Sequence, residues 1–394
     1  MRAVTYQGKR RVSVELVPDP RIQAPTDAIV RITSSGLCGS DLHLYEVLGP
    51  FMENGDVLGH EPMGIVEEVG TEAASHLAPG DRVVVPANIA CGRCATCGAK
   101  LYSQCETTQV RSYDKGAAMF GYSRLYGRVP GGQAEYLRVP QAQFGPIKVP
   151  EGPPDDRFVY LSDVLPTAWQ GVVYADVPRG GSIAVLGLGP IGDMAARVAR
   201  HRGVGIVIGV DLVPERLERA RKAGIDVLHL EEHADIATSI RDMTGGRGPD
   251  AVIDAVGMEA HGDVLGKFAH ATVGLLPDSL AAWMTERAGV DRMAALRLAI
   301  SIVRRGGTVS LLGVYGGMLD AVPMMQLFDK QIQLRMGQVN VRRWVDDLLP
   351  LLTDEDSLGV DDFATHRLPL EAAPEAYANF QAKRGGTVKV LFHP

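Results

Sequence analysis

Four of the chain's five cysteines lie within residues 91–105, in the stretch CGRCATCGAKLYSQC. Cys91, Cys94, Cys97 and Cys105 have the spacing C-x2-C-x2-C-x7-C, in which neighbouring thiolates on a tight turn can face one centre. Zinc binds four thiolates tetrahedrally when its role is structural, and it then keeps no open coordination position. An iron–sulfur cluster would more usually end in C-x3-C-P, and four unrelated thiols are not expected at this density. The spacing therefore predicts a structural zinc site.

A second candidate metal site involves the remaining cysteine. Cys38 lies in GLCGSDLH and His60 in GHEPMGIVEEVG. A reduced Cys and a His can share a catalytic metal that has three protein ligands and one open position. The pair alone leaves two interpretations open, metal ligands or ordinary packing residues. Asp163, in LSDVLPTAWQ, precedes an apolar helical pattern, so on its own it is better explained as a helix N-cap or a loop carboxylate.

A glycine-rich loop is the motif of the chain that predicts a ligand most clearly. Gly187, Gly189 and Gly192 form G-x-G-x-x-G between an apolar run expected to be a strand (182–187) and a helical pattern (191–203). In that context the first glycine allows a tight turn, the second lets the backbone approach a pyrophosphate, and the third lets helix pack on strand. The helix N-terminus then faces the phosphates, so a dinucleotide is the predicted ligand.

The acid that follows this loop indicates which dinucleotide. Asp211 ends the next expected strand (206–211), where its carboxylate would accept hydrogen bonds from the adenosine ribose. A 2′-phosphate would face that negative charge, so NAD is preferred over NADP. Arg216, in the following turn, could flank the ribose or, in a different geometry, weaken the preference for NAD over NADP. Pro190 and Ile191, inside the glycine loop, complete the expected cofactor-binding segment.

The elements that must position these residues alternate between strand and helix in the middle of the chain. Further strands are expected within 249–257, 306–317 and 330–340, and this βα alternation predicts a parallel, doubly wound sheet.

A chain of 394 residues exceeds what one hydrophobic core usually spans, so two domains are expected. The net charge of −7, with no basic block, argues against nucleic acid, and no apolar run is long enough for a membrane span. With no signal-peptide pattern and an odd number of cysteines, a cytoplasmic location is expected.

Taken together, the motifs resemble the zinc-dependent medium-chain alcohol dehydrogenases over essentially the whole chain. The resemblance rests on GLCGSDLH, GHEPMGIVEEVG, the four-cysteine lobe, the glycine-rich fingerprint and the closing GGTVKVLF. Within that family the chain is most similar to the bacterial formaldehyde dehydrogenases that work without glutathione. The grounds are LSDVLPT, with Asp where many members have Cys, and a long segment between Gly257 and Gly306.

The resemblance implies roles for specific residues. Cys38, His60 and Asp163 match the ligands of a catalytic zinc, which gives two zinc ions per chain. Glu61 matches a residue behind that zinc, and Ser40 and His43 match the family's proton relay. The positions that match the nicotinamide contacts are Thr167, Gly313, Val314, Met336, Gly337 and Gln338. Candidates for the substrate pocket are Tyr45, Leu48, Met119 and Trp169.

The resemblance also implies an architecture and a reaction. The fold class is α/β, with a GroES-like, β-rich catalytic domain in residues 1–165 and 338–394 and a Rossmann domain in 166–337. The implied enzyme transfers a hydride to NAD from a small alcohol or hydrated aldehyde bound to zinc, with formaldehyde as one candidate. A polyol-, threonine- or general alcohol-type dehydrogenase of the same family, and a non-catalytic NAD- and zinc-binding protein, remain alternatives. A homodimer or homotetramer is expected, and residues 258–305 form either an extra packed helix or a cover over the adenine.

Overall fold

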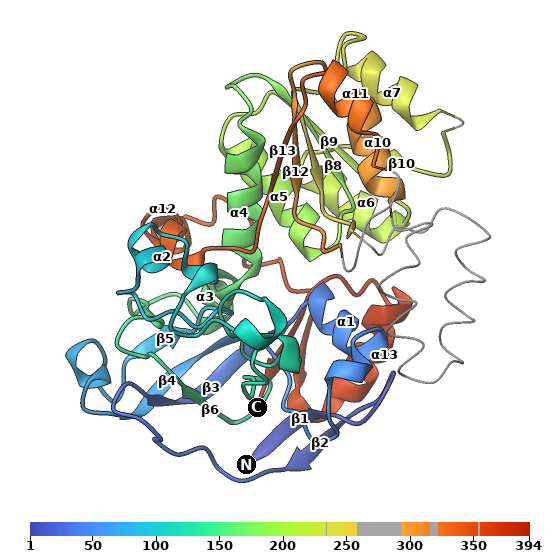
Figure 1. Cartoon of the computed structure of the whole chain (residues 1–394). Coiled ribbons are helices and arrows are strands. Elements are labelled where there is room, and N and C mark those ends of the chain that lie inside the picture. Colours follow the sequence, from blue (N-terminus) through green and yellow to red (C-terminus); the bar gives the residue numbers. More distant parts are fainter. Residues whose placement is uncertain (234, 258–292, 316–321, 354) are drawn as a thin grey trace. The chain divides into compact units, whose positions relative to one another are not determined.

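The computed structural model describes residues 1–233, 235–257, 293–315, 322–353 and 355–394 (Figure 1). The chain divides into two compact units. The first unit combines Met1–Pro166 with Val339–Pro394, so both ends of the chain build one body, and the second unit is the continuous segment Thr167–Gln338. Each unit has its own sheet, as expected for a chain too long for a single core.

The first unit is built around a largely antiparallel sheet. Among the described residues its strands follow the order β14-β15-β3-β4-β5-β7, and β6 also pairs with β3. A separate antiparallel hairpin is formed by β1 and β2. The strand bounds are β1 (Arg2–Tyr6), β2 (Val12–Leu16), β3 (Ala28–Leu37), β4 (Glu61–Val69), β5 (Arg82–Val84), β6 (Tyr136–Val139), β7 (Ile147–Lys148), β14 (His366–Pro369) and β15 (Val390–His393).

Short helical segments connect these strands and carry much of the chemistry. The α-helices of this unit are α1 (Gly39–Glu46), α2 (Ala95–Gly98), α3 (Asp155–Phe158), α12 (Val341–Thr353) and α13 (Ala373–Ala382), and α4 (Val164–Ala175) begins here and continues into the second unit. The 3-10 turns are η1 (Gly49–Phe51), η2 (Ala73–Ser75), η3 (Tyr102–Gln104), η4 (Arg111–Tyr113), η5 (Arg124–Tyr126), η6 (Val159–Ser162) and η8 (Leu370–Ala372). Such loops on a rigid sheet are where functional side chains commonly sit.

The second unit is a parallel sheet with the strand order β10-β9-β8-β11-β12-β13, which is the Rossmann order 3-2-1-4-5-6. Its strands are β8 (Ser182–Leu186), β9 (Ile206–Asp211), β10 (Asp226–His229), β11 (Ala251–Asp254), β12 (Thr308–Leu311) and β13 (Gln333–Met336). Its other helices are α5 (Pro190–His201), α6 (Pro214–Lys222), α7 (Ile236–Met243), α10 (Ala294–Ile302) and α11 (Met324–Asp329). This strand order confirms the α/β class and its Rossmann part.

Part of the long segment after Gly257 falls in the described chain. Met293, Leu296 and Ile300 are buried in the core of the second unit, the latter two on α10. The remainder, including Leu280 and Met284 and the suggested adenine cover, lies outside the described residues. None of the helices that the structure describes has the length and apolar character needed to cross a membrane.

Candidate functional site

The four clustered cysteines converge on one point. Each offers a sulfur, and all four sulfurs lie within 4.8 Å of one another. Cys94 Sγ is 3.9 Å from Cys105 Sγ, and none of the chain's cysteines forms a disulfide. Zinc–sulfur bonds of about 2.3 Å in a tetrahedron separate the sulfurs by roughly 3.8 Å, so this donor set fits a four-thiolate zinc site.

Hydrogen bonds favour the deprotonated form of two of these sulfurs, Cys91 and Cys94, whereas burial and the neighbouring Cys94 raise the pKa of Cys97. Thr107 Oγ1 donates to Cys91 Sγ at 3.1 Å, and the backbone N–H of Cys91 donates to Cys105 Sγ at 3.3 Å. Burial raises the pKa of Cys94, but the contact with Thr96 and several backbone hydrogen bonds outweigh it and lower the pKa to about 5. Because zinc binds the thiolate and not the thiol, the surroundings of Cys91 and Cys94 suit a metal, and the positive charge of a zinc ion would favour the thiolate of Cys97.

A second donor group lies elsewhere in the first unit. Cys38, His60, Glu61 and Asp163 each present one ligand atom within 4.8 Å of the others. Asp163 Oδ2 is 3.8 Å from Cys38 Sγ and 3.5 Å from His60 Nε2. Bonds of about 2.0–2.3 Å to one tetrahedral ion would place its ligands roughly 3.3–3.8 Å apart, so these three donors fit a zinc ion.

The local structure explains how residues distant in sequence meet here. Cys38 stands between the end of β3 and the start of α1, His60 lies just before β4, and Asp163 occupies the junction of η6 and α4. Because β3 and β4 are antiparallel neighbours, the end of one lies beside the start of the other. Asp163 precedes α4 as the helix-start interpretation expected, but its carboxylate faces the Cys and the His.

Asp41 was not anticipated from the sequence, although it supports two of the donors. Its Oδ2 accepts a hydrogen bond from the backbone N–H of Cys38 at 2.9 Å, and its Oδ1 lies 3.1 Å from His60 Nδ1. Burial lowers the pKa of His60, yet the charge of Asp41 and hydrogen bonds to Asp163, Asp41 and Cys38 outweigh burial, and the pKa lies well above its usual range. A carboxylate behind a histidine ligand fixes the ring orientation. One sequence pattern could have pointed to Asp41: it is an acid three residues after the helix N-cap Cys38, which is the pattern of a capping box.

The expected relay residues share one helix. Ser40 and His43 lie on α1, three positions apart, so they occupy neighbouring positions on its surface. Ser40 Oγ is 3.1 Å from His60 Nε2. A hydroxyl this close to a donor atom lies beside any metal that the donors hold.

Glu61 meets a cation that sequence reasoning missed. Lys389 and Glu61 form an ion pair in which both side chains have 0% exposure. Burial lowers the pKa of Lys389, but the charges of Glu61 and Cys38 and the hydrogen bond to Glu61 raise it overall. The two residues are 328 positions apart in the chain, so no local pattern could have linked them.

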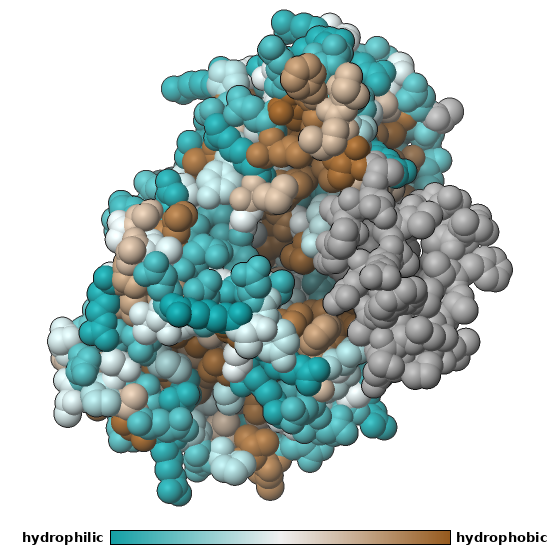
Figure 2. Space-filling view, viewed as in Figure 1, coloured by the Kyte–Doolittle hydropathy of each residue, from teal (hydrophilic) through white to brown (hydrophobic). Residues whose placement is uncertain are grey.

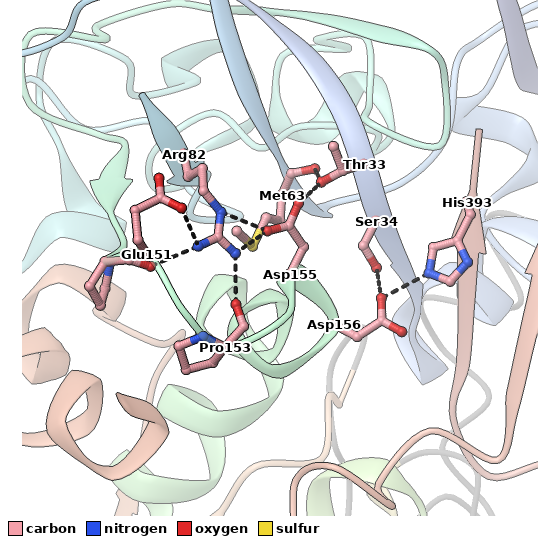
Figure 3. A network of polar contacts seen from close by, with 10 residues as sticks. Thr33, Ser34, Met63, Arg82, Glu151, Pro153, Asp155, Asp156 and His393 are labelled. Atoms are coloured by element: carbon pink, nitrogen blue, oxygen red, sulfur yellow. Dashed lines mark hydrogen bonds and ion pairs between the residues drawn. The ribbon is translucent and has the colours of Figure 1, made fainter. Parts of the chain in front are cut away.

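A polar network anchors the segment that leads to Asp163 (Figure 3). Asp155, at the start of α3, accepts hydrogen bonds from Thr33 on β3 and from Arg82 on β5, whose Nε lies 3.0 Å away. Arg82 also donates to the carbonyl oxygens of Pro150 and Pro153. The start of α3 is therefore tied to two strands of the sheet.

The next residue makes a second set of contacts. Asp156 Oδ1 accepts from Ser34 Oγ at 2.9 Å and lies 2.8 Å from His393 Nε2 (Figure 3). Its Oδ2 accepts from Arg367 Nε at 2.7 Å. Burial alone would raise the pKa of Asp156, but the hydrogen bonds from His393 and Arg367 lower it below its usual range. Since α3 runs directly into η6 and Asp163, these contacts fix the approach of the chain to the donor group.

The suggested pocket residues are divided between the two units. Tyr45, Leu48 and Met119 belong to the same hydrophobic cluster of the first unit. Trp169 belongs to the second unit, where its ring meets the His201 ring and the Arg202 guanidinium, the latter 4.8 Å from the ring centre. Tyr122, which the sequence did not single out, is buried in the same cluster as Tyr45 with its ring edge-on to His60.

The glycine loop of the second unit has the geometry that its motif requires. Gly187 has φ +83°, a value that L side chains rarely adopt. A Cβ at Gly192 would overlap the carbonyl oxygen of Gly187, so only glycine allows this close packing of helix on strand. Gly189 is the N-cap of α5, and Pro190 and Ile191 form its first turn. The backbone N–H groups of this turn have no intrahelical partners and suit an anion.

Asp211 stands at the end of β9, next to the same loop. Its Oδ2 accepts the backbone N–H of Leu188 at 2.6 Å, and its Oδ1 accepts those of Leu212 and Val213. Arg216 Nη1 lies 3.7 Å from Asp211 Oδ2 and near Gly189. Backbone hydrogen bonds thus hold the Asp211 carboxylate beside the glycine loop, and the Arg216 guanidinium lies near both this carboxylate and the N-cap of α5.

The positions expected at the nicotinamide follow other strands of this parallel sheet. Gly313 and Val314 come after β12, and Gly337 and Gln338 after β13, so they lie at the same carboxyl edge as the glycine loop. Gln170 Nε2 donates to the carbonyl oxygens of Gly337 and Gln338, which ties them to α4, the helix that carries Thr167. Ligands of open α/β sheets bind along this edge.

A buried acid also braces this edge. Asp254, at the end of β11, accepts a hydrogen bond from Tyr315 Oη and from the backbone N–H groups of Val256 and Gly257. The carbonyl oxygen of Asp254 accepts from the N–H of Gly313 at 2.8 Å. Neither Asp254 nor Gln170 was anticipated from the sequence, because neither belongs to a recognised motif.

Comparisons with known proteins agree with this geometry. Residues 24–151 match the alcohol dehydrogenase GroES-like domain, and residues 190–269 match the zinc-binding dehydrogenase family. The chain is 39% identical to the zinc-type alcohol dehydrogenase-like protein AdhB of Bacillus subtilis, with 100% of both chains covered. It is 31% identical to the glutathione-independent formaldehyde dehydrogenase of Pseudomonas aeruginosa, covering 97% of this chain and 95% of that protein.

A solved structure gives the same result for the fold. The alcohol dehydrogenase TADH from Thermus sp. ATN1 superposes with a TM-score of 0.84 at 36% identity, with 100% of each chain covered. The resemblance seen in the sequence is therefore confirmed at the level of the family. The chain belongs to the zinc-type medium-chain alcohol dehydrogenases and is an oxidoreductase.

Proposed function

We propose that the protein is a zinc- and NAD-dependent dehydrogenase that oxidises a small alcohol or a hydrated aldehyde. The observation that carries the proposal is the donor set Cys38, His60 and Asp163, with the Ser40 hydroxyl 3.1 Å from one donor atom. A site with three protein donors beside a hydroxyl suits catalysis, whereas the four-cysteine group is a closed set suited to a structural role. We assign catalysis to the first unit and cofactor binding to the second.

The chain's own residues supply binding and proton transfer. Zinc held by Cys38, His60 and Asp163 would act as a Lewis acid toward the substrate oxygen. Ser40 Oγ, next to that site, accepts the proton of the substrate hydroxyl and releases its own proton toward His43 on the same helix, and His43 gives a proton to solvent. Asp41 keeps His60 oriented during this transfer.

The second unit binds the cofactor that accepts the hydride. NAD would accept the hydride at its nicotinamide ring. The N-terminus of α5, with Gly187, Gly189 and Gly192, binds the pyrophosphate, and Asp211 accepts the ribose hydroxyls. Gly313, Val314, Gly337 and Gln338, at the carboxyl edge, and Thr167 on α4 contact the nicotinamide half. Arg216, close to both the acid and the loop, neutralises part of the pyrophosphate charge.

Formaldehyde is the finer substrate that we propose. Asp163 is an oxygen donor, and zinc with one thiolate and one carboxylate is formally neutral, as it is with two thiolates. A harder donor set leaves the metal more Lewis-acidic toward a geminal diol, the hydrated form of formaldehyde. A relative 31% identical over nearly the whole chain is named a glutathione-independent formaldehyde dehydrogenase, which supports this choice over a polyol or threonine substrate.

The decisive experiment compares substrates on protein whose zinc content has been measured. Initial rates of NADH formation with formaldehyde, ethanol, longer alcohols and a polyol should be highest for formaldehyde, without added glutathione. Asp163→Cys, which keeps the charge and changes only the donor, should lower the rate with formaldehyde relative to ethanol. A clear preference of the unaltered protein for alcohols would reject the formaldehyde assignment, and no turnover with two zinc ions per chain would reject the dehydrogenase.

We further propose that the protein is a homo-oligomer that pairs through the second unit. Strand β13 is an edge of its sheet and exposes Leu334 and Met336, while the adjacent α11 exposes Met324, Met325 and Phe328. Apolar side chains gather in Figure 2 where α11 and β13 lie in Figure 1. Exposed apolar edge strands commonly pair with a partner. Light scattering should give a multiple of 42.3 kDa, and Phe328→Glu should lower it.

A further inference from the structure

The buried pair Lys389–Glu61 has no place in the scheme above. Both side chains have 0% exposure, and Lys389 Nζ also donates to the carbonyl oxygen of Leu37 at 3.1 Å. Lysine is almost never fully buried unless it is paired, because removing an ammonium from water is costly. Among the described residues, Glu61 is the carboxylate that this ammonium contacts.

The fold reserves space for this pair. Gly36 on β3 faces Glu61 on β4 in the antiparallel register, and Leu391 of β15 faces Gly36 from the other side. A Cβ at position 36 would overlap Glu61 Oε2 and come within 3.0 Å of Lys389 Nζ. The three strands therefore bring the ammonium and the carboxylate together over a position that carries no side chain.

Glu61 is at the same time a potential metal ligand. One of its carboxylate oxygens lies within 4.8 Å of the donor atoms of Cys38, His60 and Asp163. Its Oε1 is buried and has no hydrogen-bond partner within the described part of the chain. Two cations thus compete for a single carboxylate: the Lys389 ammonium and the metal that the other three donors would hold.

We propose that Lys389 is a positioning residue that keeps the Glu61 carboxylate as its own partner and so withholds it from the catalytic zinc. This inference rests on the proposed zinc site. Cys38 and Asp163 offset the two charges of zinc, and Lys389 offsets Glu61, so Glu61 need not bind the metal to be neutralised. The coordination position that Glu61 would otherwise occupy stays open for a substrate oxygen.

The test reads the metal directly instead of turnover. Cobalt(II) replaces zinc at the catalytic site, and its visible absorption reports the number and kind of ligands. Lys389→Met should add Glu61 as a ligand, change the spectrum and weaken imidazole binding to the cobalt by about tenfold or more, because imidazole would then have to displace a carboxylate. Lys389→Arg, which keeps the charge, should retain the spectrum of the unaltered protein.

Two further variants make the result decisive. In Lys389→Met/Glu61→Gln the competing carboxylate is gone, so the spectrum and the imidazole affinity should return toward those of the unaltered protein. Glu61→Gln alone should leave the spectrum unchanged, and this holds even if Lys389→Met does not fold. A changed spectrum in Glu61→Gln, or an unchanged one in folded Lys389→Met, would overturn the inference.

Failure of the underlying site is recognised separately. If the unaltered protein binds metal only at the four cysteines, one ion per chain, then the proposed catalytic site itself is wrong. That result appears before any variant is compared. With two ions bound, the variants judge Lys389 alone.

Discussion

The two candidate metal centres differ in how the chain assembles them. The four-cysteine group takes all of its donors from residues 91–105, and its sulfurs are stabilised by neighbours such as Thr96 and Thr107. The second group takes donors from positions 38, 60 and 163 and is supported by Asp41 and Lys389. A local, closed donor set suits structure, whereas a set gathered from several elements can leave a coordination position open for chemistry.

The largest effect on stability should come from removing one thiolate of the four-cysteine site. Cys94→Ser removes one of four thiolates, and structural zinc contributes on the order of 10 kcal/mol to the folding of small zinc lobes. We expect loss of one zinc ion per chain and a lower unfolding temperature, followed by calorimetry and metal analysis. The matched control is Cys38→Ser, which should lose the other zinc and change the unfolding temperature much less. Equal thermal effects of the two variants would contradict this division of roles.

Cys38→Ser should lower the rate of turnover more than Cys94→Ser does, because it removes the metal that activates the substrate and not a metal that stabilises the fold. Losing the metal's Lewis acidity costs several kcal/mol in the transition state, or about a thousandfold in kcat/KM. Steady-state NADH formation measures the loss. Retention of activity within a few-fold, with one zinc ion missing, would show that the second group is not the reaction centre.

A smaller effect is expected from the support behind His60. Asp41→Asn keeps the shape of the side chain but removes the charge beside His60 Nδ1. Zinc affinity at the catalytic site should fall by about 10- to 100-fold, while the four-cysteine site keeps its metal. Competition with a chromophoric chelator measures both affinities in one experiment. Equal weakening at both sites would mean that the variant disturbs the fold and not the ligand.

The smallest effect concerns the network that leads to Asp163, and it depends on pH. Asp156 has a lowered pKa in the folded protein, so its contribution is fully present above the pKa of the unfolded chain and is lost as the pH falls through the folded-state pKa. Asp156→Asn should lower the free energy of unfolding by about 1–3 kcal/mol near neutral pH. The difference from the unaltered protein should disappear in acid, well below pH 4, the usual range of an aspartate.

Denaturant unfolding at a series of pH values checks this prediction. Asp361→Asn is the control, because its ion pair with Arg157 has an acid that is 45% exposed, and exposed pairs contribute little. A difference between Asp156→Asn and the unaltered protein that stays constant down to pH 2 would contradict the assignment to this carboxylate.

The accuracy of the sequence predictions varied with the locality of the signal. The expected strands 182–187 and 206–211 match β8 and β9 closely, because glycines and a terminal acid mark their ends. Strand β10 was not anticipated, since Asp226–His229 is a short edge strand without fully buried residues and has little apolar pattern. Asp163 by itself looked like a helix-start residue, and only its position opposite Cys38 and His60 gives it another meaning.

By itself, the sequence determined the cysteine cluster, the glycine loop with Asp211, the parallel, doubly wound character of the second sheet and, through the family resemblance, the candidate ligands of the second site. The cysteine cluster and the glycine loop depend on spacings of a few residues, which the chain cannot alter when it folds, whereas the ligands of the second site were assigned only by resemblance. Only the tertiary structure decided that Asp41 lies behind His60 and that Lys389 meets Glu61 over Gly36. The first contact depends on the pairing of β3 with β4, and the second on strand register across 328 positions of the chain. A lysine in a β-rich segment has no local reason to be buried until three strands enclose it.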